Sequence, residues 1–412
     1  MKNNFLLNEG YNQHRKNFFS KAEKDFVYNT KGKKFIDLGF CSGANLLGHN
    51  SAIERKIYKN YIKKKISNFS APNKYAADFA FNIKKTLPGF SKFIFCNSGS
   101  EANLKAIRIC RAITNKDKIV NVTGSWHGAA DQFLFGSDKN LKIFKLSDGI
   151  PKEAKKNLVF IPYNDIEVSR KILDKIKKEI SCIMIEPIQG CLPDISAINY
   201  LKFLESYAKT NKIILFFDEI ITGLRTNGSS VQDYFKIKTD ISTFGKAFGN
   251  GIPLGFIGIS KNIEKIIKKK KLKIYFGGTF SGNSLSMFCS NEFLKFVIKN
   301  KKKIFLNLKE KTSFFEEKVN NFCKKNNLDV KVYSFFSMFR IIYSSKKIKN
   351  RYQRDFFESR QNSNIKKFKK YLYLNKIYQP KNGIMFFSYI SSKKNIKFVT
   401  DKFNIGLKKY FV

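Results

Sequence analysis

Between residues 91 and 260 the chain alternates short apolar runs with stretches of helical periodicity. The apolar runs predict buried strands at residues 91–96, 118–122, 181–186, 213–218 and 256–260. The stretches at residues 102–113 and 198–210 predict helices between them. This alternation is typical of an α/β fold in which a mostly parallel sheet is covered on both faces. Ligands of such sheets bind beyond the carboxyl ends of the strands.

The two ends of the chain have a different pattern. Before residue 91, the pattern predicts a strand at residues 33–38 and helices at 52–66 and 74–87. After about residue 300, it predicts a long helix (305–324), two strands (329–333 and 338–343), a helix near 351–374, a strand at 384–389 and a last helix from Asn395. This order indicates a smaller α+β domain. We expect the N-terminal segment to pack with that domain or against the larger one.

Composition adds an extreme charge to this picture. The 412 residues, of which 43% are hydrophobic, predict a globular protein of two or three units. The formal net charge of +46 could indicate nucleic acid or an anionic membrane surface as a partner. However, the lysines are spread along the chain, and Lys, Asn, Ile and Phe, which AT-rich codons encode, are all heavily used. We therefore favour compositional drift, with the lysine runs at 63–65, 268–271 and 301–303 on solvated helix faces.

The cysteines and the chain's apolar segments favour a reduced, cytoplasmic protein. The seven cysteines have no CxxC spacing, so neither a disulfide framework nor a zinc site is expected, and most should be buried thiols. The apolar patch at residues 5–7 is too short for a secretory signal. No run approaches the ~20 apolar residues of a membrane span.

The first candidate for chemistry is the end of the apolar run 213–217, where Asp218 and Glu219 follow directly. Helix capping or a turn is the ordinary explanation for an acid at this position. A carboxylate that is buried away from solvent needs a cationic partner. A protonated pyridine nitrogen is such a partner, and Asp218 would keep it protonated so that the ring withdraws electrons from a carbanion.

The second candidate is Lys246, which lies among glycines in the apolar stretch 242–255, apart from the charge runs. It can be an ordinary lysine on a glycine-rich turn. A lysine in an apolar pocket has a lowered pKa and is a good Schiff-base nucleophile. Asp240 and Ala247 exclude a Walker A motif, and the glycines at 249, 251 and 255 miss the dinucleotide-binding spacing.

Two further segments follow predicted strands. Residues 97–103 (NSGSEAN) lead into a helix, so that backbone N–H groups and Ser100 make an anion site, although Ser98 and Glu101 also have the spacing of a plain capping box. Residues 124–128 (GSWHG) contain Trp126, the only tryptophan, which could stack on a flat cofactor ring or serve as a core residue. His127 is one of three histidines, and these lack the additional acids that a metal site needs.

Taken together and in this order, these segments resemble the class III (fold type I) aminotransferases, and within them the glutamate-1-semialdehyde 2,1-aminomutases. The resemblance is strong from about Lys33 to Asn283 and fainter beyond. Its motifs are NSGSEA at 97–102, WHG at 126–128, EPIQG at 186–190, FDEIITGLR at 217–225, GK at 245–246 and GGTFSGN at 277–283. It implies a PLP enzyme with a seven-stranded, mostly parallel sheet in a large domain (51–300), a small α+β domain (301–412), and an N-terminal segment (1–50) that joins the small domain.

The resemblance also implies roles for individual residues. Lys246 would hold pyridoxal 5'-phosphate (PLP) as a Schiff base and move the substrate proton, and Asp218 would pair with the pyridine nitrogen. The remaining contacts would be Gly99 and Ser100 with the phosphate, Trp126 and Ile220 on the two ring faces, Gln189 near the ring hydroxyl, and Thr279 at the phosphate of the neighbouring subunit. A homodimer is therefore expected.

The positions expected to contact the substrate depart from the aminomutase pattern. Arg15 is only a candidate for the substrate-binding arginine, because its segment lacks the usual prolines, and Ile384 stands where an acid is expected. We therefore favour an aminotransferase that moves an amino group between a small-molecule donor and a carbonyl carbon of another substrate. The true aminomutase of 5-aminolevulinate synthesis is the alternative. A different reaction on the same cofactor and a non-catalytic basic binding protein are further possibilities.

Overall fold

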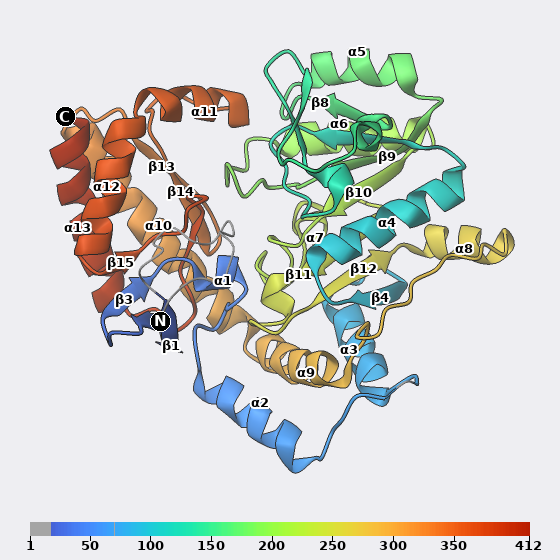
Figure 1. The fold of residues 1–412 in the computed structure, drawn as a ribbon, viewed down its shortest axis with the longest axis horizontal. Helices are drawn as coiled ribbons and strands as arrows, with labels where there is room; N and C mark the ends of the chain where they lie inside the picture. Colours follow the sequence, from blue (N-terminus) through green and yellow to red (C-terminus); the bar gives the residue numbers. More distant parts are fainter. Residues whose placement is uncertain (1–17, 70) are drawn as a thin grey trace.

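The computed structural model describes residues 18–69 and 71–412. Arg15 therefore lies outside the described residues. The centre of the molecule is a seven-stranded sheet that is parallel except for one strand (Figure 1). Its strands, in spatial order, are β4 (Lys92–Cys96), β12 (Gly255–Ile259), β11 (Ile241–Gly245), β10 (Ile214–Asp218), β9 (Ile180–Ile185), β5 (Lys118–Val122) and β8 (Leu158–Ile161). The predicted α/β fold class is confirmed.

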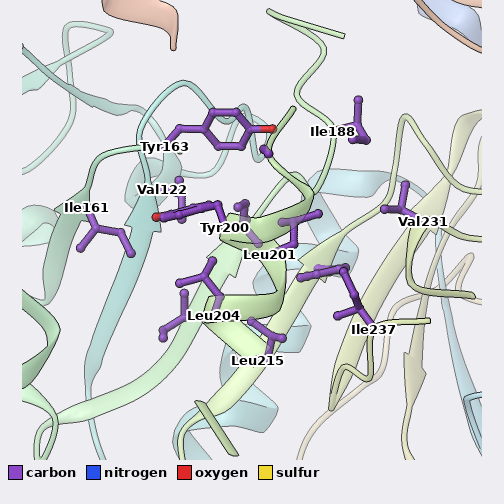
Figure 2. Close-up of a cluster of buried hydrophobic side chains, with 14 of the residues drawn as sticks. Val122, Ile161, Tyr163, Ile188, Tyr200, Leu201, Leu204, Leu215, Val231 and Ile237 are labelled. Atoms are coloured by element: carbon purple, nitrogen blue, oxygen red, sulfur yellow. The ribbon is translucent and has the colours of Figure 1, made fainter. Parts of the chain in front are cut away.

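The strands form because they are short apolar runs that can be buried on both faces. β9, β10 and β12 are buried at every position. α4 (Gly99–Thr114) packs on β9, β11 and β12, whereas α6 (Ile198–Thr210) packs on β10. Figure 2 shows Tyr200, Leu201 and Leu204 of α6 beside Val122 and Leu215 of the sheet. This core fixes the carboxyl ends of the strands in space.

Helices around the sheet complete the large part of the molecule. They are α2 (Ala52–Lys63), α3 (Lys74–Thr86), α5 (Ile166–Ile176), α7 (Val231–Phe235), α8 (Lys261–Lys269) and α9 (Ser284–Lys299). Smaller elements are α1 (Phe40–Gly43), the hairpin β6 (Phe135–Ser137) and β7 (Ile143–Lys145), and the 3-10 turns η1 (Asp131–Phe133), η2 (Lys152–Lys155) and η3 (Lys246–Phe248). The three lysine runs are exposed at helix ends, as predicted.

The two ends of the chain share one sheet. β1 (Phe19–Glu23), β2 (Phe26–Asn29) and β3 (Lys34–Asp37) form an antiparallel meander, and β15 (Ile377–Tyr378) pairs in parallel with β3. Ile36 and Leu38 pack in one core with C-terminal residues. The described part of the N-terminal segment thus packs with the C-terminal part, although the division at residues 50 and 300 stays a prediction.

The C-terminal part departs from the predicted elements in two places. Its elements are α10 (Lys301–Lys325), β13 (Lys331–Phe335), β14 (Met338–Ile342), α11 (Arg351–Arg360), α12 (Asn362–Leu374), β16 (Met385–Phe386) and α13 (Lys393–Phe411). The single helix predicted at 351–374 is two helices, because the chain leaves helical geometry at Gln361. The strand predicted at 384–389 is only β16, because the Tyr389 N–H bonds to Leu46 instead of continuing beside β14.

The sequence pattern also missed two strands of the main sheet. β8 is only four residues long, and β11 contains the polar residues Ser242 and Thr243. Both hydroxyl groups are buried and hydrogen-bonded, to Thr239 and Asn103 respectively, which is how a polar strand can lie in the core. Among residues 18–69 and 71–412, no helix is both long and apolar enough to cross a membrane.

Candidate active site

Asp218 is the last residue of β10 and lies at the carboxyl edge of the sheet, with 2% of its surface exposed. Its Oδ2 accepts hydrogen bonds from His127 Nδ1 at 2.8 Å and from Asn103 Nδ2 at 2.7 Å. Its Oδ1 accepts one from the Ile220 N–H at 3.1 Å. Among the described residues, no lysine or arginine forms an ion pair with this carboxylate. The site therefore has a buried, oriented carboxylate that can receive a cationic group.

His127 and Asn103 hold Asp218 in place from two other elements. Asn103, on α4, also donates to the His127 carbonyl at 2.9 Å and accepts from Thr243 Oγ1 at 2.6 Å. His127 Nε2 is buried and has no hydrogen-bond partner among the described residues. In the part of the chain that the structure describes, no cluster of His, Cys, Asp and Glu could hold a metal ion.

Lys246 follows β11 immediately and begins η3 with φ of 38°. This left-handed conformation is uncommon for a residue with a β-carbon, and such strain concentrates at functional sites. Burial lowers the pKa of the Lys246 amine, and the carboxylates of Glu186 and Asp218 oppose this shift. A lysine of this kind has a larger neutral fraction, which is the form that attacks a carbonyl carbon.

The turn before α4 combines helix capping with an open helix start. Ser98 is the N-cap, and its Oγ accepts from the Glu101 N–H at 3.2 Å. The Glu101 carboxylate accepts a hydrogen bond from the Asn97 N–H at 2.8 Å. In a plain capping box it would accept from the N–H of the N-cap residue, Ser98, so this turn is not a plain capping box. The first N–H groups of a helix have no partner within the helix and attract anions. An anion site at Gly99 and Ser100 is compatible with this geometry.

The loop that follows β5 packs directly on this turn. Ser100 Oγ accepts a hydrogen bond from the Ala129 N–H at 3.1 Å. Gly128 has φ of +105°, and a β-carbon there would lie 2.2 Å from Ser100 Oγ, so only glycine fits. On the other side, Ile220 Cδ1 lies 2.9 Å from where a β-carbon of Gly99 would be and 3.4 Å from that of Gly245. Ile220 thus lies between the α4 turn and the residue before Lys246.

Trp126 and Gln189 lie on the same loop cluster. The Trp126 side chain is 56% exposed, so its interpretation as a core residue is wrong, whereas stacking on a cofactor ring stays a prediction. Gln189 is fully buried, and its Nε2 donates to the Thr123 carbonyl at 2.8 Å and to Ser125 Oγ at 3.2 Å. Its approach to a ring hydroxyl also stays a prediction.

Sequence reasoning missed Glu186 as a member of the site. Glu186 follows β9 as Asp218 ends β10, is 6% exposed, and accepts from the Trp126 N–H at 2.8 Å. Burial, with a further contribution from Asp218, raises its pKa to about 7. An acid at the end of an apolar strand was the signal that identified Asp218, and the same signal was present here.

Two more neighbours of Lys246 were not predicted. Cys41 and Arg225 both act electrostatically on its amine. Cys41 is exposed and lies within α1, where Phe40, Cys41 and Ser42 all have positive φ. Arg225 is buried and donates to Ile221, Ser337 and Gly43, so it joins the large sheet region to both chain ends. A pattern of residue types gives no signal for such contacts, because they depend on how the chain ends fold back.

The Aminotransferase class-III family model matches residues 8–355. This chain belongs to the class III aminotransferases. The glutamate-1-semialdehyde 2,1-aminomutase of Methanococcus maripaludis is 34% identical over 366 residues, which cover 86% of this chain and 82% of that protein. The predicted family, the predicted class of enzyme and the dependence of that class on PLP are thereby confirmed.

Solved structures show the same fold at low sequence identity. An omega-transaminase from Sphaerobacter thermophilus has a TM-score of 0.88 with 19% identity, covering 95% of this chain and 91% of its own. A glutamate-1-semialdehyde aminomutase from Pseudomonas aeruginosa PAO1, solved in complex with PMP, has a TM-score of 0.85 with 14% identity, covering 96% and 88%. These likenesses establish the fold type I architecture of this aminotransferase.

In this aminotransferase, Ile384 lies close to the predicted cofactor residues. It is 5% exposed, and its Cδ1 lies 3.1 Å from where a β-carbon of Gly190 would be, beside Ile221 at 3.2 Å. Glu186 Oε1 lies 3.8 Å from the same point. The position where the aminomutase pattern has an acid is therefore an apolar wall next to a buried carboxyl group.

Thr279 lies on an exposed loop that the buried Lys105 of α4 holds in place. Lys105 is 5% exposed, pairs with Glu101, and donates to the Phe276 carbonyl at 2.9 Å and to Ser281 Oγ at 3.2 Å. Tyr275 and Phe280 of this loop are 75% and 59% exposed. Exposed aromatic residues of this kind are enriched at protein interfaces. The contact of Thr279 with a neighbouring subunit stays a prediction.

We expect Lys105→Met to destabilise the protein by about 1–3 kcal/mol, because it leaves the partly buried partners of Lys105 without their donor. Denaturant unfolding and limited proteolysis at the loop 275–283 would measure this loss. Lys268→Met is the matched control: its i,i+4 pair with Glu264 is exposed on the lysine side and should contribute at most about 1 kcal/mol. Equal losses in the two variants would contradict the role of Lys105.

Proposed function

We propose that this aminotransferase binds PLP through Lys246 and Asp218 and moves an amino group between a small-molecule amino donor and a carbonyl carbon. The observation that carries this proposal is the placement of the two residues at the carboxyl edge of adjacent parallel strands. Asp218 ends β10 opposite Thr243 of β11, and Lys246, three residues after Thr243, follows the end of β11 directly. One ligand at this edge can reach both.

The residues present fit a cofactor of this shape and charge. A buried carboxylate that forms no ion pair with a lysine or arginine of the described residues suits a pyridinium nitrogen, the start of α4 suits a phosphate, and a partly buried amine with a lowered pKa suits an aldehyde. When bound, PLP supplies an electron sink for the carbanion that forms at the substrate carbon.

The chain's own residues supply the binding and the proton transfers. Asp218, oriented by His127 and Asn103, keeps the ring nitrogen protonated. The Lys246 amine holds the cofactor at rest and, once displaced by an amino donor, moves a proton at the substrate carbon. Gly99 and Ser100 receive the phosphate, Ile220 and Trp126 face the ring, and Gln189 lies near its hydroxyl. We further propose a cytoplasmic homodimer in which Thr279 reaches the partner's phosphate, without a specific nucleic-acid or membrane partner.

Within this family we favour an aminotransferase with another substrate over the true aminomutase. Ile384 supports this preference, because its side chain can neither bind an ammonium group nor transfer a proton. The second candidate is glutamate-1-semialdehyde 2,1-aminomutase itself, which the 34% identity to a relative of that name supports.

Supplying glutamate 1-semialdehyde to PLP-loaded protein and measuring 5-aminolevulinate separates the two candidates. We expect slow formation of 5-aminolevulinate and faster amino transfer with some donor and acceptor in a screen. Rapid conversion of glutamate 1-semialdehyde would favour the aminomutase. A protein that stays colourless after incubation with PLP would instead favour a non-catalytic binding protein.

A further inference from the structure

Arg225 is a buried cation whose hydrogen-bond acceptors are all uncharged. It is 1% exposed and donates to the Ile221 carbonyl at 2.9 Å, to Ser337 Oγ at 2.7 Å and to the Gly43 carbonyl. Its guanidinium also lies over the Phe386 ring, 4.8 Å from the ring centre. No carboxylate of the described residues forms an ion pair with it. A buried charge without a counter-ion is unfavourable for stability, so stability alone does not explain this residue.

The α1 turn joins Arg225 to the surroundings of Lys246. α1 lies between the C-terminal part and the large sheet (Figure 1) and packs on η3, which begins with Lys246. The Gly43 carbonyl at the end of α1 accepts from Arg225 Nη2, and a β-carbon on Gly43 would lie 2.8 Å from that atom. At its start, the Phe40 N–H donates to Asp37 at 3.0 Å. Arg225 therefore fixes one end of the strained turn beside Lys246.

The segment that carries Arg225 also packs directly on the segment that carries Lys246. A β-carbon on Gly223 would lie 2.6 Å from Phe244 Cδ1 of β11 and 3.2 Å from Phe248 Cε2 of η3. Lys246 is between these two phenylalanines in the chain, and Arg225 is two residues after Gly223. The guanidinium is thus placed beside η3 by its own chain segment and by α1.

Four ionisable groups from four segments act on the Lys246 amine. Burial lowers the pKa of Lys246, and the carboxylates of Glu186, after β9, and Asp218, at the end of β10, raise it. Arg225 lowers this pKa, whereas Cys41 of α1 raises it. Arg225 is the one group of the four that carries a positive charge. A neighbouring cation is one of the ways in which proteins make a lysine nucleophilic.

We propose that Arg225 is a positioning residue that keeps the Lys246 amine neutral and reactive, by holding an unpaired positive charge behind the α1 turn. The inference rests on the proposed function, in which that amine attacks the aldehyde of the cofactor. The comparison with Arg354 supports it, because Arg354 is also buried but is paired with the carboxylate of Asp355. The charge of Arg225 is not cancelled in this way and therefore acts on its surroundings.

Competitive acylation of the cofactor-free protein with acetic anhydride tests the proposal. The neutral amine is the form that reacts, so the pH of half-maximal labelling, measured by mass spectrometry, reports the protonation of Lys246. In Arg225→Gln this midpoint should move to higher pH, and labelling of Lys246 at neutral pH should be about 3- to 30-fold slower relative to the exposed Lys268. Arg225→Lys should recover most of the labelling, because it keeps the charge. Should Arg225→Gln fail to fold, Arg225→Met gives the same test.

Ser337→Ala is the matched control, because it removes one acceptor of the Arg225 guanidinium and leaves the charge in place. It should lower the free energy of unfolding and leave the labelling midpoint of Lys246 unchanged. Arg360→Gln, which removes a positive charge from the exposed end of α11, should also leave the midpoint unchanged and so exclude an effect of net charge. An unchanged midpoint in the Gln and Met variants of Arg225, equal shifts in Arg225→Lys and Arg225→Gln, or a shift in Ser337→Ala would each overturn the proposal.

Visible spectra of the same variants after incubation with PLP give a second readout. The pH at which the absorption band of lysine-bound PLP changes should be higher in Arg225→Gln than in the wild type. The acylation needs no PLP, so the two outcomes are separate. A wild type that stays colourless with PLP would refute the proposed function, and the labelling of Lys246 would still decide on Arg225.

Discussion

Lys246→Ala should abolish the visible absorption band of lysine-bound PLP and nearly all amino transfer. The amine of Lys246 is the only group that we assign both to the covalent attachment and to the proton transfer. Its removal therefore affects two functions at once, and effects of residues with such shared roles do not add. Visible spectra after incubation with PLP, followed by single-turnover assays with an amino donor, would measure both losses.

Lys311→Ala is the control for this experiment. Lys311 is also a buried lysine, with its pKa lowered to about 8 by burial, but it donates to the carbonyls of Ser388 and Tyr389 in the C-terminal part. The Lys311→Ala variant should be less stable than the wild type and should keep the visible absorption band of lysine-bound PLP. Retention of the band and of turnover in Lys246→Ala would refute the central assignment, and loss of the band in both variants would point to damage of the fold.

Asp218→Asn should reduce turnover strongly while leaving PLP attached to Lys246. The substitution keeps the shape of the side chain and removes the charge that would face the ring nitrogen. Truncating one partner of a buried, hydrogen-bonded charge pair costs about 2–5 kcal/mol, which corresponds to roughly 30- to 5,000-fold in rate. Rate measurements of each half-reaction, together with the visible spectrum, would show this separation.

The appropriate comparison is Asp240→Asn at the opposite edge of the same sheet. Asp240 accepts from the Leu215 N–H at 3.0 Å, before β11 begins, and burial raises its pKa. The Asp240→Asn substitution should change the free energy of unfolding and leave the rate of amino transfer per bound PLP unaltered. A similar fall in rate in both variants would show that Asp218 acts only through the fold.

Much of the site was predictable because its reactive residues stand where the hydrophobic pattern of the sequence is interrupted. Asp218 ends an apolar strand, and Lys246 stands among glycines away from the other lysines, so each is visible in the sequence. Their joint placement follows from the parallel sheet. β11 was missed although Lys246 follows it directly, because Ser242 and Thr243 interrupt its apolar pattern and only their buried partners explain them.

The remaining parts depend on contacts between distant segments, which no local pattern contains. α11 packs beside the candidate site because it folds back onto residues that precede it by more than one hundred and fifty positions, as the bonds of Tyr352 to Ser137 and of Arg354 to Cys191 show. The early end of β16 likewise depends on a distant segment, because the Tyr389 N–H bonds to the Leu46 carbonyl. The predicted roles of Trp126, Gln189 and Thr279 need a bound cofactor or a second subunit to be tested.

The sheet shared by the two chain ends has a consequence for biosynthesis. β3 ends at Asp37, and its parallel partner β15 begins at Ile377. At ~5–20 residues per second, the ribosome needs roughly 20–70 seconds to make the chain between them. During that time the edge of β3 that faces β15 lacks this partner, so the nascent protein carries an open strand edge. The N-terminal meander therefore gains its fourth strand only when nearly the whole chain has been made.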